Sequence, residues 1–293
     1  MSTAEDIPAR EAAVPFVDLR SVEKSFGRNH VLRGIDLQIA PGEIITLLGG
    51  SGTGKSVLLK HMIGLLQPDR GEVWIDGRDV TRLGERDWVE LRRRFGYVFQ
   101  GGALFDSLSV LENVAYPLRE HLDLDEAVLR ERVARCLESV GLAGIEAMMP
   151  AELSGGMRKR VAVARAIALE PDAVLYDEPT TGLDPANSRR IGELIVSLRD
   201  RLGVTSVIVT HELELCFSIS DRVALLKDGR FVACDAADRI RTSTDPVVRS
   251  FLAGGGSLEA DSVWLTRDDS GEGAEEAGDR AGDDAGEETS DGA

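Results

Sequence analysis

The segment GGSGTGKS, residues 49–56, constrains the fold of this chain more than any other feature. It satisfies the pattern GxxxxGK[ST], in which small residues let successive backbone amides curl around the phosphates of a nucleotide. EIITLLGG, which runs into it, is typical of a short buried strand, and SVLLKHMIGLL, which leads out of it, is typical of a mostly apolar helix. Strand, glycine loop and helix in this order predict a phosphate loop in an α/β sheet.

The segments around this loop show strand periodicity. FVDLRSVEKSFG and HVLRGIDLQIA alternate apolar and polar residues around a short turn, which predicts an N-terminal antiparallel layer. GEVWIDGRDV predicts a hairpin around its Asp-Gly pair, and FGYVFQ predicts a further strand ending at Gln100. The first hundred residues therefore carry two kinds of strand, one set antiparallel and one leading into the phosphate loop.

The second half of the chain has the parallel βαβ pattern. AVLYDEP and VTSVIVTH are apolar, β-branched runs separated by a helical segment at 187–202. DRVALLKDGRFVACDA predicts a last hairpin, and DPVVRSFL a helix. These runs supply the remaining strands of a mostly parallel sheet.

A helical region interrupts this sheet between Gln100 and about Ala168. LDEAVLRERVARCLESVGL and MRKRVAVARAIAL both show 3.6-residue periodicity with few strand signals. The predicted fold class is therefore α/β: a P-loop NTPase core with a mostly parallel sheet, an N-terminal antiparallel β layer and an inserted α-helical subdomain at about 101–168.

Composition predicts one large folded domain with polar ends. Of the 293 residues 43% are hydrophobic, which supports a substantial core at 15–254. Residues 1–14 are predicted to be a flexible N-terminus. Residues 255–293 are rich in Gly, Asp, Glu, Ser and Ala and can bury too little apolar area to offset their chain entropy, so an acidic, disordered tail is expected. The net charge of −17 argues against nucleic acid as a partner, because phosphates demand a basic face.

The cysteines and the apolar runs favour a protein of the reducing cytosol. Cys136, Cys216 and Cys234 are scattered without CxxC spacing or a companion histidine cluster, so disulfide and metal sites are not indicated. The amino terminus lacks an apolar targeting core, and no apolar run approaches the roughly 18 residues that a membrane helix needs. We expect a chain that does not itself span a membrane.

Two pairs of residues carry the chemistry expected of a nucleotide site. In the phosphate loop Lys55 would neutralise the β and γ oxygens, and Ser56 would offer its hydroxyl to Mg²⁺. At the end of a buried strand Asp177 would hold Mg²⁺ through water, while Glu178 would position and polarise an attacking water. Paired acids at a strand end can also be a plain helix-capping turn, but the phosphate loop upstream favours the catalytic interpretation.

Two more polar residues end predicted strands. His211 follows VTSVIVT near the expected position of the γ-phosphate, although a lone histidine is more often structural. Gln100 ends FGYVFQ and could reach both the metal and the attacking water. Both are candidate catalytic residues because strand ends form the ligand edge of such sheets.

A second anion-binding turn is predicted at LSGGM, residues 153–157. Ser154, Gly155 and Gly156 run into a helix whose exposed N–H groups and positive end would attract an anion. This turn contains no lysine of its own, and one ATP needs only one phosphate loop.

Together these motifs resemble the nucleotide-binding domain of ABC transporters. GGSGTGKS, Gln100, LSGGM, VLYDEP, TGLDP and His211 stand in the order and approximate spacing of that family, over residues 16–252. The resemblance implies two such domains packed head to tail, in which the signature turn Ser154–Gly156 of one chain caps the ATP held by the other. It implies that Asp184 communicates between the two sites. Met157 stands where many members have glutamine, and little effect on hydrolysis is expected.

The resemblance also implies a set of ATP-binding residues, with Phe26 stacking on the adenine and ATP and Mg²⁺ as ligands. The set comprises Phe26, Gly49, Gly50, Ser51, Gly52, Thr53, Gly54, Lys55, Ser56 and Val57. The metal would be held by Ser56, Gln100 and Asp177.

A finer resemblance lies between Gln100 and Leu169 and again near DPVVRSFLAG. These sequence segments resemble those of the ATPase subunits of the Mla/MCE phospholipid transport systems, which maintain outer-membrane lipid asymmetry. That similarity implies an ATPase homodimer on the cytoplasmic side of the inner membrane, attached to an integral membrane permease and an MCE-type lipid-binding subunit, with phospholipid as cargo. An importer ATPase for a small polar solute such as an amino acid is the alternative. A soluble ABC ATPase without a permease is a further alternative, which the lack of a second nucleotide domain, long coiled coils or a basic surface disfavours.

Overall fold

The computed structural model describes residues 14–254, which all belong to one compact unit spanning Met1–Glu259. The flexible end predicted for residues 1–14, apart from Val14, and the tail predicted for 255–293 lie outside the described residues.

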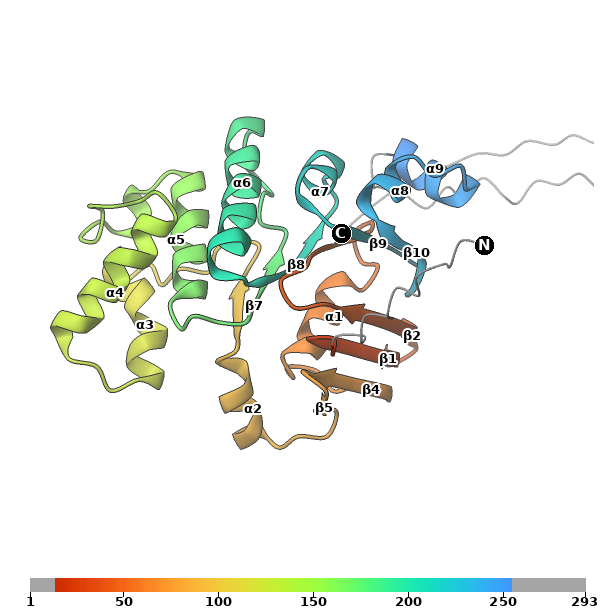
Figure 1. Ribbon diagram of the computed structural model, residues 1–293, viewed down its shortest axis with the longest axis horizontal. Coiled ribbons are helices and arrows are strands. Elements are labelled where there is room, and N and C mark those ends of the chain that lie inside the picture. Colours follow the sequence, from red (N-terminus) through yellow and green to blue (C-terminus); the bar gives the residue numbers. More distant parts are fainter. Residues whose placement is uncertain (1–13, 255–293) are drawn as a thin grey trace, which may run out of the picture. The chain divides into compact units, whose positions relative to one another are not determined.

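An antiparallel sheet forms the N-terminal layer, as its period-2 alternation predicted (Figure 1). β1 pairs with β2 on one side and with β4 on the other, and β5 completes the order β2-β1-β4-β5. The strands are β1 Val17–Phe26, β2 Asn29–Ile39, β4 Arg70–Ile75 and β5 Arg78–Asp79.

A six-stranded sheet in the order β10-β9-β3-β8-β7-β6 carries the phosphate loop. Neighbours from β9 to β6 are parallel, and only the edge pair of β10 with β9 is antiparallel. The strands are β3 Ile44–Leu48, β6 Phe95–Val98, β7 Ala173–Asp177, β8 Thr205–Thr210, β9 Arg222–Lys227 and β10 Arg230–Ala236. The mostly parallel sheet predicted from the apolar runs is therefore observed.

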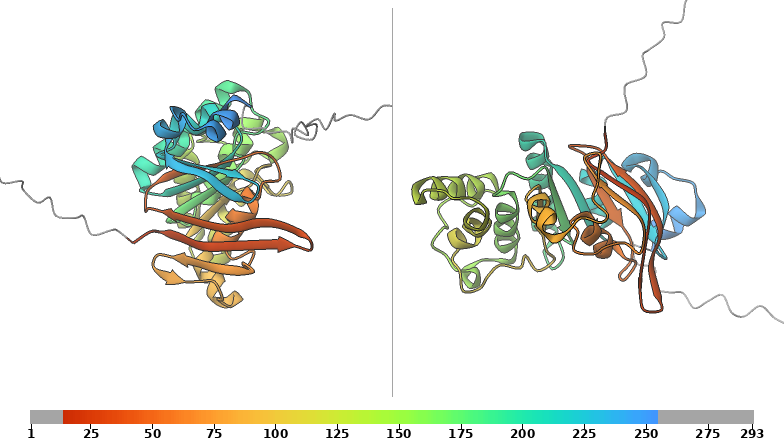
Figure 2. Two further views of the ribbon diagram at one scale, coloured as in Figure 1. Left: turned by 90° about the vertical axis from the view of Figure 1, so that its right-hand side faces the viewer. Right: turned by 90° about the horizontal axis from the view of Figure 1, so that it is seen from below.

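Between β6 and β7 the chain leaves the sheet and forms a group of helices. Figure 1 and the right-hand view of Figure 2 show α3, α4 and α5 gathered at one end of the unit, away from the antiparallel sheet. α3 begins with a capping box in which Ser109 and Glu112 satisfy each other's backbone N–H groups. The elements are α3 Val110–His121, α4 Glu126–Ser139, a 3₁₀ turn at Pro150–Glu152 and α5 Gly155–Ile167.

The remaining helices flank the sheets. α1 Lys55–Met62 leaves the phosphate loop, and α6 Pro185–Leu202 connects β7 to β8. Short helices that the sequence pattern did not predict are α2 Glu85–Arg92, α7 Leu213–Ile219 and α8 Ala237–Arg241. α9 Pro246–Ala253 corresponds to the helix predicted at DPVVRSFL.

The parallel sheet is buried on both faces. Alternate residues of β7 enter different hydrophobic clusters: Val174 and Tyr176 pack with α3, α4, α5 and α6, whereas Ala173 and Leu175 pack with α1 and the antiparallel sheet. β8 does the same, with Ile208 on the first side and Val207 on the second. Burial of both faces explains why these strands read as continuous apolar runs in the sequence.

Candidate functional site

The candidate site lies at one edge of the six-stranded sheet, where four parallel strands end together. In the strand register Leu48 of β3 lies beside Thr210 of β8, and Asp177 of β7 lies beside Val209 of β8. Val98 of β6 lies beside Tyr176. The residues that follow these strands are thus brought to a common edge, which is the ligand-binding edge of open α/β sheets.

The phosphate loop connects β3 to α1 at this edge. Gly54 has φ +104°, and a Cβ there would lie 3.0 Å from the side chains of Val31 and Leu32, so only glycine fits. A Cβ on Gly49 would lie 2.7 Å from the carbonyl oxygen of Leu226. These two glycines let the loop pass close to neighbouring strands and turn into α1, whose N-terminus then faces the site.

Lys55 folds back over its own loop. Its Nζ donates to the carbonyl oxygens of Gly49, at 2.7 Å, and Gly50, at 2.8 Å. Burial lowers the pKa of Lys55, and the negative charges of Glu178 and Asp177 oppose that shift. The buried Lys55 ammonium, which lies near two carboxylates, could compensate the negative charge of a bound polyphosphate.

Asp177 joins the phosphate loop to the end of β6. Its Oδ1 accepts from the Ser56 hydroxyl at 2.9 Å, and its Oδ2 accepts from the Tyr97 hydroxyl at 3.1 Å. Burial, followed by the Asp177 charge, raises the pKa of Tyr97, so this phenol stays protonated and donates. Ser56 and Asp177 are thus brought into direct contact, although 121 residues separate them.

Glu178 and His211 also meet. His211 Nδ1 lies 2.9 Å from Glu178 Oε2 and 3.1 Å from Oε1, and the Thr181 hydroxyl donates to Oε2 at 3.2 Å. The Glu178 side chain is 14% exposed and that of His211 is 51% exposed. The carboxylate is therefore enclosed and oriented by two side chains, while the imidazole remains open to a ligand.

Gln100 and Phe26 are less tightly embedded. Gln100 follows β6 and is exposed at the start of the segment leading to α3. Phe26 ends β1, is 47% exposed, and has the Lys24 ammonium 5.7 Å from its ring centre. Both side chains are therefore accessible from the solvent and are not packed in the core.

Asn187 lies against both the signature turn and Asp184. Ser154 caps α5, its hydroxyl accepting from the Met157 N–H at 3.2 Å, and Asp184 caps α6. Asn187 Nδ2 donates to Asp184 Oδ2 at 2.5 Å, and a Cβ on Gly156 would lie only 3.0 Å from Asn187 Oδ1. Gly155 is the first residue of α5 and follows Ser154 directly. A Cβ on Gly155 would lie 3.5 Å from the side chain of Leu183, which precedes Asp184.

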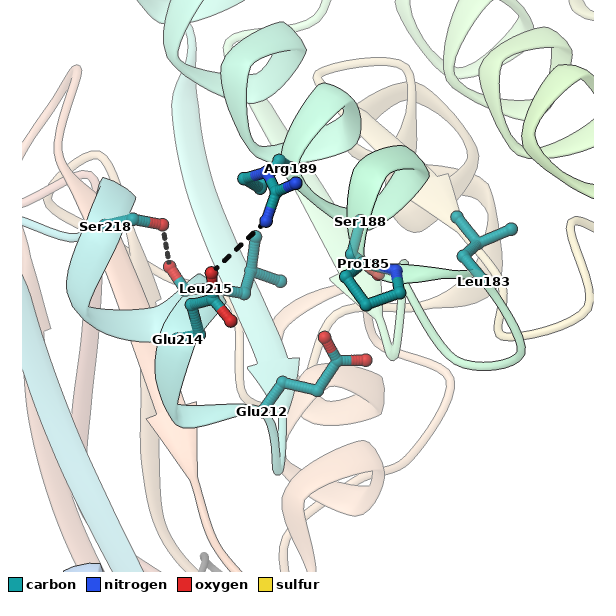
Figure 3. Close-up of a pocket in the computed structure, with 8 residues that line it drawn as sticks. All are labelled: Leu183, Pro185, Ser188, Arg189, Glu212, Glu214, Leu215 and Ser218. Carbon is teal, nitrogen blue, oxygen red and sulfur yellow. Dashed lines mark hydrogen bonds and ion pairs between the residues drawn. The ribbon is translucent and has the colours of Figure 1, made fainter.

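A pocket of about 220 Å³ opens next to this turn, between the start of α6 and α7 (Figure 3). Figure 3 shows Arg189 reaching across it toward Glu214, with which it forms a 3.7 Å ion pair. The pocket is lined by Leu183, Pro185, Ser188, Arg189, Glu212, Glu214, Leu215 and Ser218. It borders the Asp184 loop rather than the phosphate loop, so it is distinct from the place where the carboxyl strand ends converge.

Sequence reasoning missed four residues that the fold brings to these groups: Tyr97, Lys159, Thr181 and Asn187. Lys159 of α5 is only 7% exposed, and burial lowers its pKa against the opposing charges of Glu178, Asp177 and Glu212. Lys159 lies between Arg158 and Arg160 in the sequence, so nothing local distinguishes it from its basic neighbours. The other three have ordinary strand, loop and helix surroundings in the sequence.

Comparison with known proteins identifies the family. The model of the ABC transporter family matches residues 32–181, which include the phosphate loop, the signature turn and the Asp177–Glu178 pair. The chain belongs to the ABC transporter family. As a member with this cassette it is an ATP-binding, ATP-hydrolysing enzyme.

Curated relatives of this ATPase carry two kinds of name. The probable ribonucleotide transport ATP-binding protein mkl of Mycobacterium leprae is 42% identical over 238 residues, covering 81% of this chain and 69% of the relative. The intermembrane phospholipid transport system ATP-binding protein MlaF of Haemophilus influenzae is also 42% identical over 238 residues, covering 81% of this chain and 90% of the relative. MlaF of Escherichia coli K12 is 41% identical over 244 residues, covering 83% and 91%.

Solved ABC cassettes share the fold. A dimeric post-hydrolysis state of the ATP-binding cassette MJ0796 bound to ADP and Pi superposes with a TM-score of 0.70 at 34% identity, covering 75% of this chain and 98% of that one. The cbiO1 protein of Clostridium perfringens gives a TM-score of 0.74 at 29% identity, covering 81% and 95%. Both are cassettes of the predicted fold class, which is therefore confirmed.

Helices long and apolar enough to cross a membrane are not found within residues 14–254.

Proposed function

We propose that this ATPase is the motor of a phospholipid transport system. It would act as a homodimer on the cytoplasmic side of the inner membrane, attached to an integral membrane permease and an MCE-type lipid-binding subunit. The observation that carries the proposal is the similarity to phospholipid-transport MlaF proteins, at 41–42% identity over 90–91% of their length. The sequence between Gln100 and Leu169 supports it, because the resemblance to Mla-type ATPases lies there, in the helical region to which the permease would bind.

ATP hydrolysis would use the groups gathered at the strand ends. Lys55 would leave the carbonyls of its loop and pair with the β and γ oxygens of ATP, which form stronger, charge-assisted bonds. Glu178 would accept a proton from the attacking water and polarise it, and His211, bonded to that carboxylate, would contact the γ-phosphate. Phe26, exposed at the end of β1, would stack on the adenine.

The residues expected to hold Mg²⁺ fit that ion. Ser56 and Asp177 supply a hydroxyl and a carboxylate 2.9 Å apart, and Gln100 could add an amide oxygen, all of which are the hard oxygen donors that Mg²⁺ prefers. The ion would neutralise charge on the β- and γ-phosphates. Tyr97, by donating to the second oxygen of Asp177, would fix the orientation of that carboxylate.

A head-to-tail dimer would explain the second anion-binding turn. Ser154 and the backbone of Gly155 and Gly156 would cap the γ-phosphate of the ATP bound by the partner subunit. Asp184, linked to the same turn through Asn187, would carry changes between the two sites. Closure would then depend on ATP, because the nucleotide supplies phosphate contacts that bridge the chains.

An aromatic groove offers the permease a place to dock. It has a volume of about 430 Å³ and lies between the end of β6, α3 and α5. Phe99, Phe105 and Tyr116 are each 43–44% exposed there, and the rings of Phe105 and Tyr116 lie 4.8 Å apart. Exposed apolar rings of this kind are characteristic of protein-binding surfaces. Gln100 leaves β6 beside the groove, so a docked permease segment would adjoin the hydrolysis site.

The names of the mycobacterial relatives favour a second cargo. The mkl proteins match at the same identity and are named for ribonucleotide transport, which would make this chain the importer ATPase of a small polar solute. The phospholipid proposal is preferred because the chain covers more of the MlaF proteins, 90–91% against 66–69%.

Purification from gently solubilised membranes tests the cargo. We expect a permease, an MCE-type subunit and phospholipid above the background of a mock purification, all identified by mass spectrometry. A different permease without lipid would move the cargo to a polar solute, and recovery of the ATPase without any membrane protein would contradict the transport motor itself.

A further inference from the structure

Lys159 is a buried cation whose side chain leads from the signature helix to the hydrolysis site. It is 7% exposed and lies one turn into α5 from the signature turn. Its Nζ donates to the carbonyl oxygen of Gln100 and, at 3.3 Å, to that of Glu178. A buried ammonium is costly unless it is paired or hydrogen-bonded, so these two carbonyls are specific partners rather than incidental neighbours.

The backbone of Glu178 is strained at the point where Lys159 contacts it. Glu178 has φ +50°, in the left-handed region that residues with a side chain rarely adopt, and it precedes Pro179. Such a conformation persists only where the surroundings hold it. The Glu178 N–H donates to Val209 at 2.9 Å, whereas its carbonyl oxygen accepts from Lys159 at 3.3 Å and from the Thr181 N–H at 3.4 Å.

We propose that Lys159 is a positioning residue for ATP hydrolysis: anchored on the Gln100 carbonyl, its ammonium holds the strained Glu178 peptide so that the Glu178 carboxylate stays against His211. The inference rests on the proposed catalytic role of Glu178. Without Lys159 the carbonyl would keep only the long contact to Thr181, and the peptide could relax and turn the carboxylate away.

The partners of Lys159 specify a charged donor. Glu178, Asp177 and Glu212 all act on its charge, so a neutral side chain of similar shape would remove one of the two buried ammonium groups, Lys55 being the other, that compensate Glu178 and Asp177. An arginine could reach both carbonyls with its several N–H groups and keep the charge. The nucleotide contacts of the phosphate loop would be untouched by either change, because Lys55 bonds only to its own loop among the described residues.

The test compares Lys159→Met with Lys159→Arg and Glu178→Gln in the full chain. We expect Lys159→Met to lower kcat roughly 10–100-fold, as misplacement of a reacting group does, with the KM for ATP changed by less than about twofold. Lys159→Met should also retain intact ATP after rapid desalting, as is expected of Glu178→Gln, and Lys159→Arg should recover kcat to within about threefold of wild type. Arg160→Met is the matched control, since Arg160 on the same helix donates to the carbonyls of Val140 and Gly141, and it should behave as wild type.

Normal turnover by Lys159→Met would overturn the inference. So would a joint loss of kcat and ATP affinity that Lys159→Arg shares, because that pattern indicates damage to the fold. If Lys159→Met does not fold, Lys159→Leu, which also lacks a donor, replaces it with the same expectation. If Glu178→Gln traps ATP and Lys159→Met does not, this inference alone is overturned. If Glu178→Gln hydrolyses ATP normally, the catalytic role of Glu178 on which the inference rests is overturned as well.

Discussion

At the scale of single residues, Glu178 is where ATP binding and ATP hydrolysis can be separated. Its carboxylate is held by His211 and Thr181 and, within the described part of the chain, forms no hydrogen bond with the phosphate loop, so Glu178→Gln should bind ATP normally. We expect turnover to fall by about 10²–10⁴-fold, the usual contribution of a general base, with ATP-bound dimers accumulating. Phosphate release and gel filtration with ATP measure the two effects. Glu214→Gln, in the exposed ion pair with Arg189, should change neither, and a Glu178→Gln protein with wild-type turnover would refute the assignment.

The sequence predicts some site residues and not others for a physical reason. Short sequence motifs, whose spacing is set by the chemistry of nucleotide binding, are enough to propose Lys55, Ser56, Asp177 and Glu178. Tyr97, by contrast, meets Asp177 only because β6 pairs with β7 in a particular register, 80 residues further along the chain. Thr181 and Asn187 depend in the same way on turns and close approaches that periodicity does not encode. The catalytic roles themselves remain predictions.

At the scale of elements, the turn from Phe105 to Ser109 depends on one buried amide. Asn113 of α3 is fully buried and accepts from the Phe105 N–H, while its Nδ2 donates to the carbonyls of Phe105, Leu108 and Ser109. Asn113→Ala would leave the Phe105 N–H and the Leu108 carbonyl without these partners and should lower the free energy of unfolding by about 1–3 kcal/mol. Urea denaturation measures this. Glu120→Ala, on the exposed side of the same helix, should stay within about 0.5 kcal/mol, and an unchanged midpoint for Asn113→Ala would contradict the expectation.

The elements that sequence periodicity predicted are the long or strongly apolar ones. The buried parallel strands, α5 and α6 all appear as expected because each presents several apolar residues at one period. α2 buries only Trp88, and α8 has five residues, so neither shows a periodic face long enough to detect. Their positions are set by tertiary packing, as at Gly64, where a Cβ would lie 2.1 Å from the Trp88 ring.

At the scale of the whole molecule, the proposed head-to-tail dimer predicts complementation between two inactive variants. Lys55→Ala removes the phosphate-loop cation, and Ser154→Asp places a like charge against phosphate while keeping a good helix cap. Each variant alone should be inactive. In an equal mixture half the dimers would be mixed, each with one intact site of two, which gives about a quarter of wild-type ATPase activity if the sites are independent. No activity in the mixture would mean that each chain completes its own site.

The position of β3 has a consequence for how the protein is made. This strand, which leads into the phosphate loop, pairs only with β8 and β9 among the described strands, and these lie more than 150 residues further along the chain. Pairings so distant in sequence form late, because a long loop must close first. While the chain emerges from the ribosome, the antiparallel layer of β1, β2 and β4 can form early, but β3 has no neighbour in its sheet until Thr210 has been synthesised and released. A nascent chain arrested before β8 should therefore fail to bind ATP even though its phosphate loop is complete.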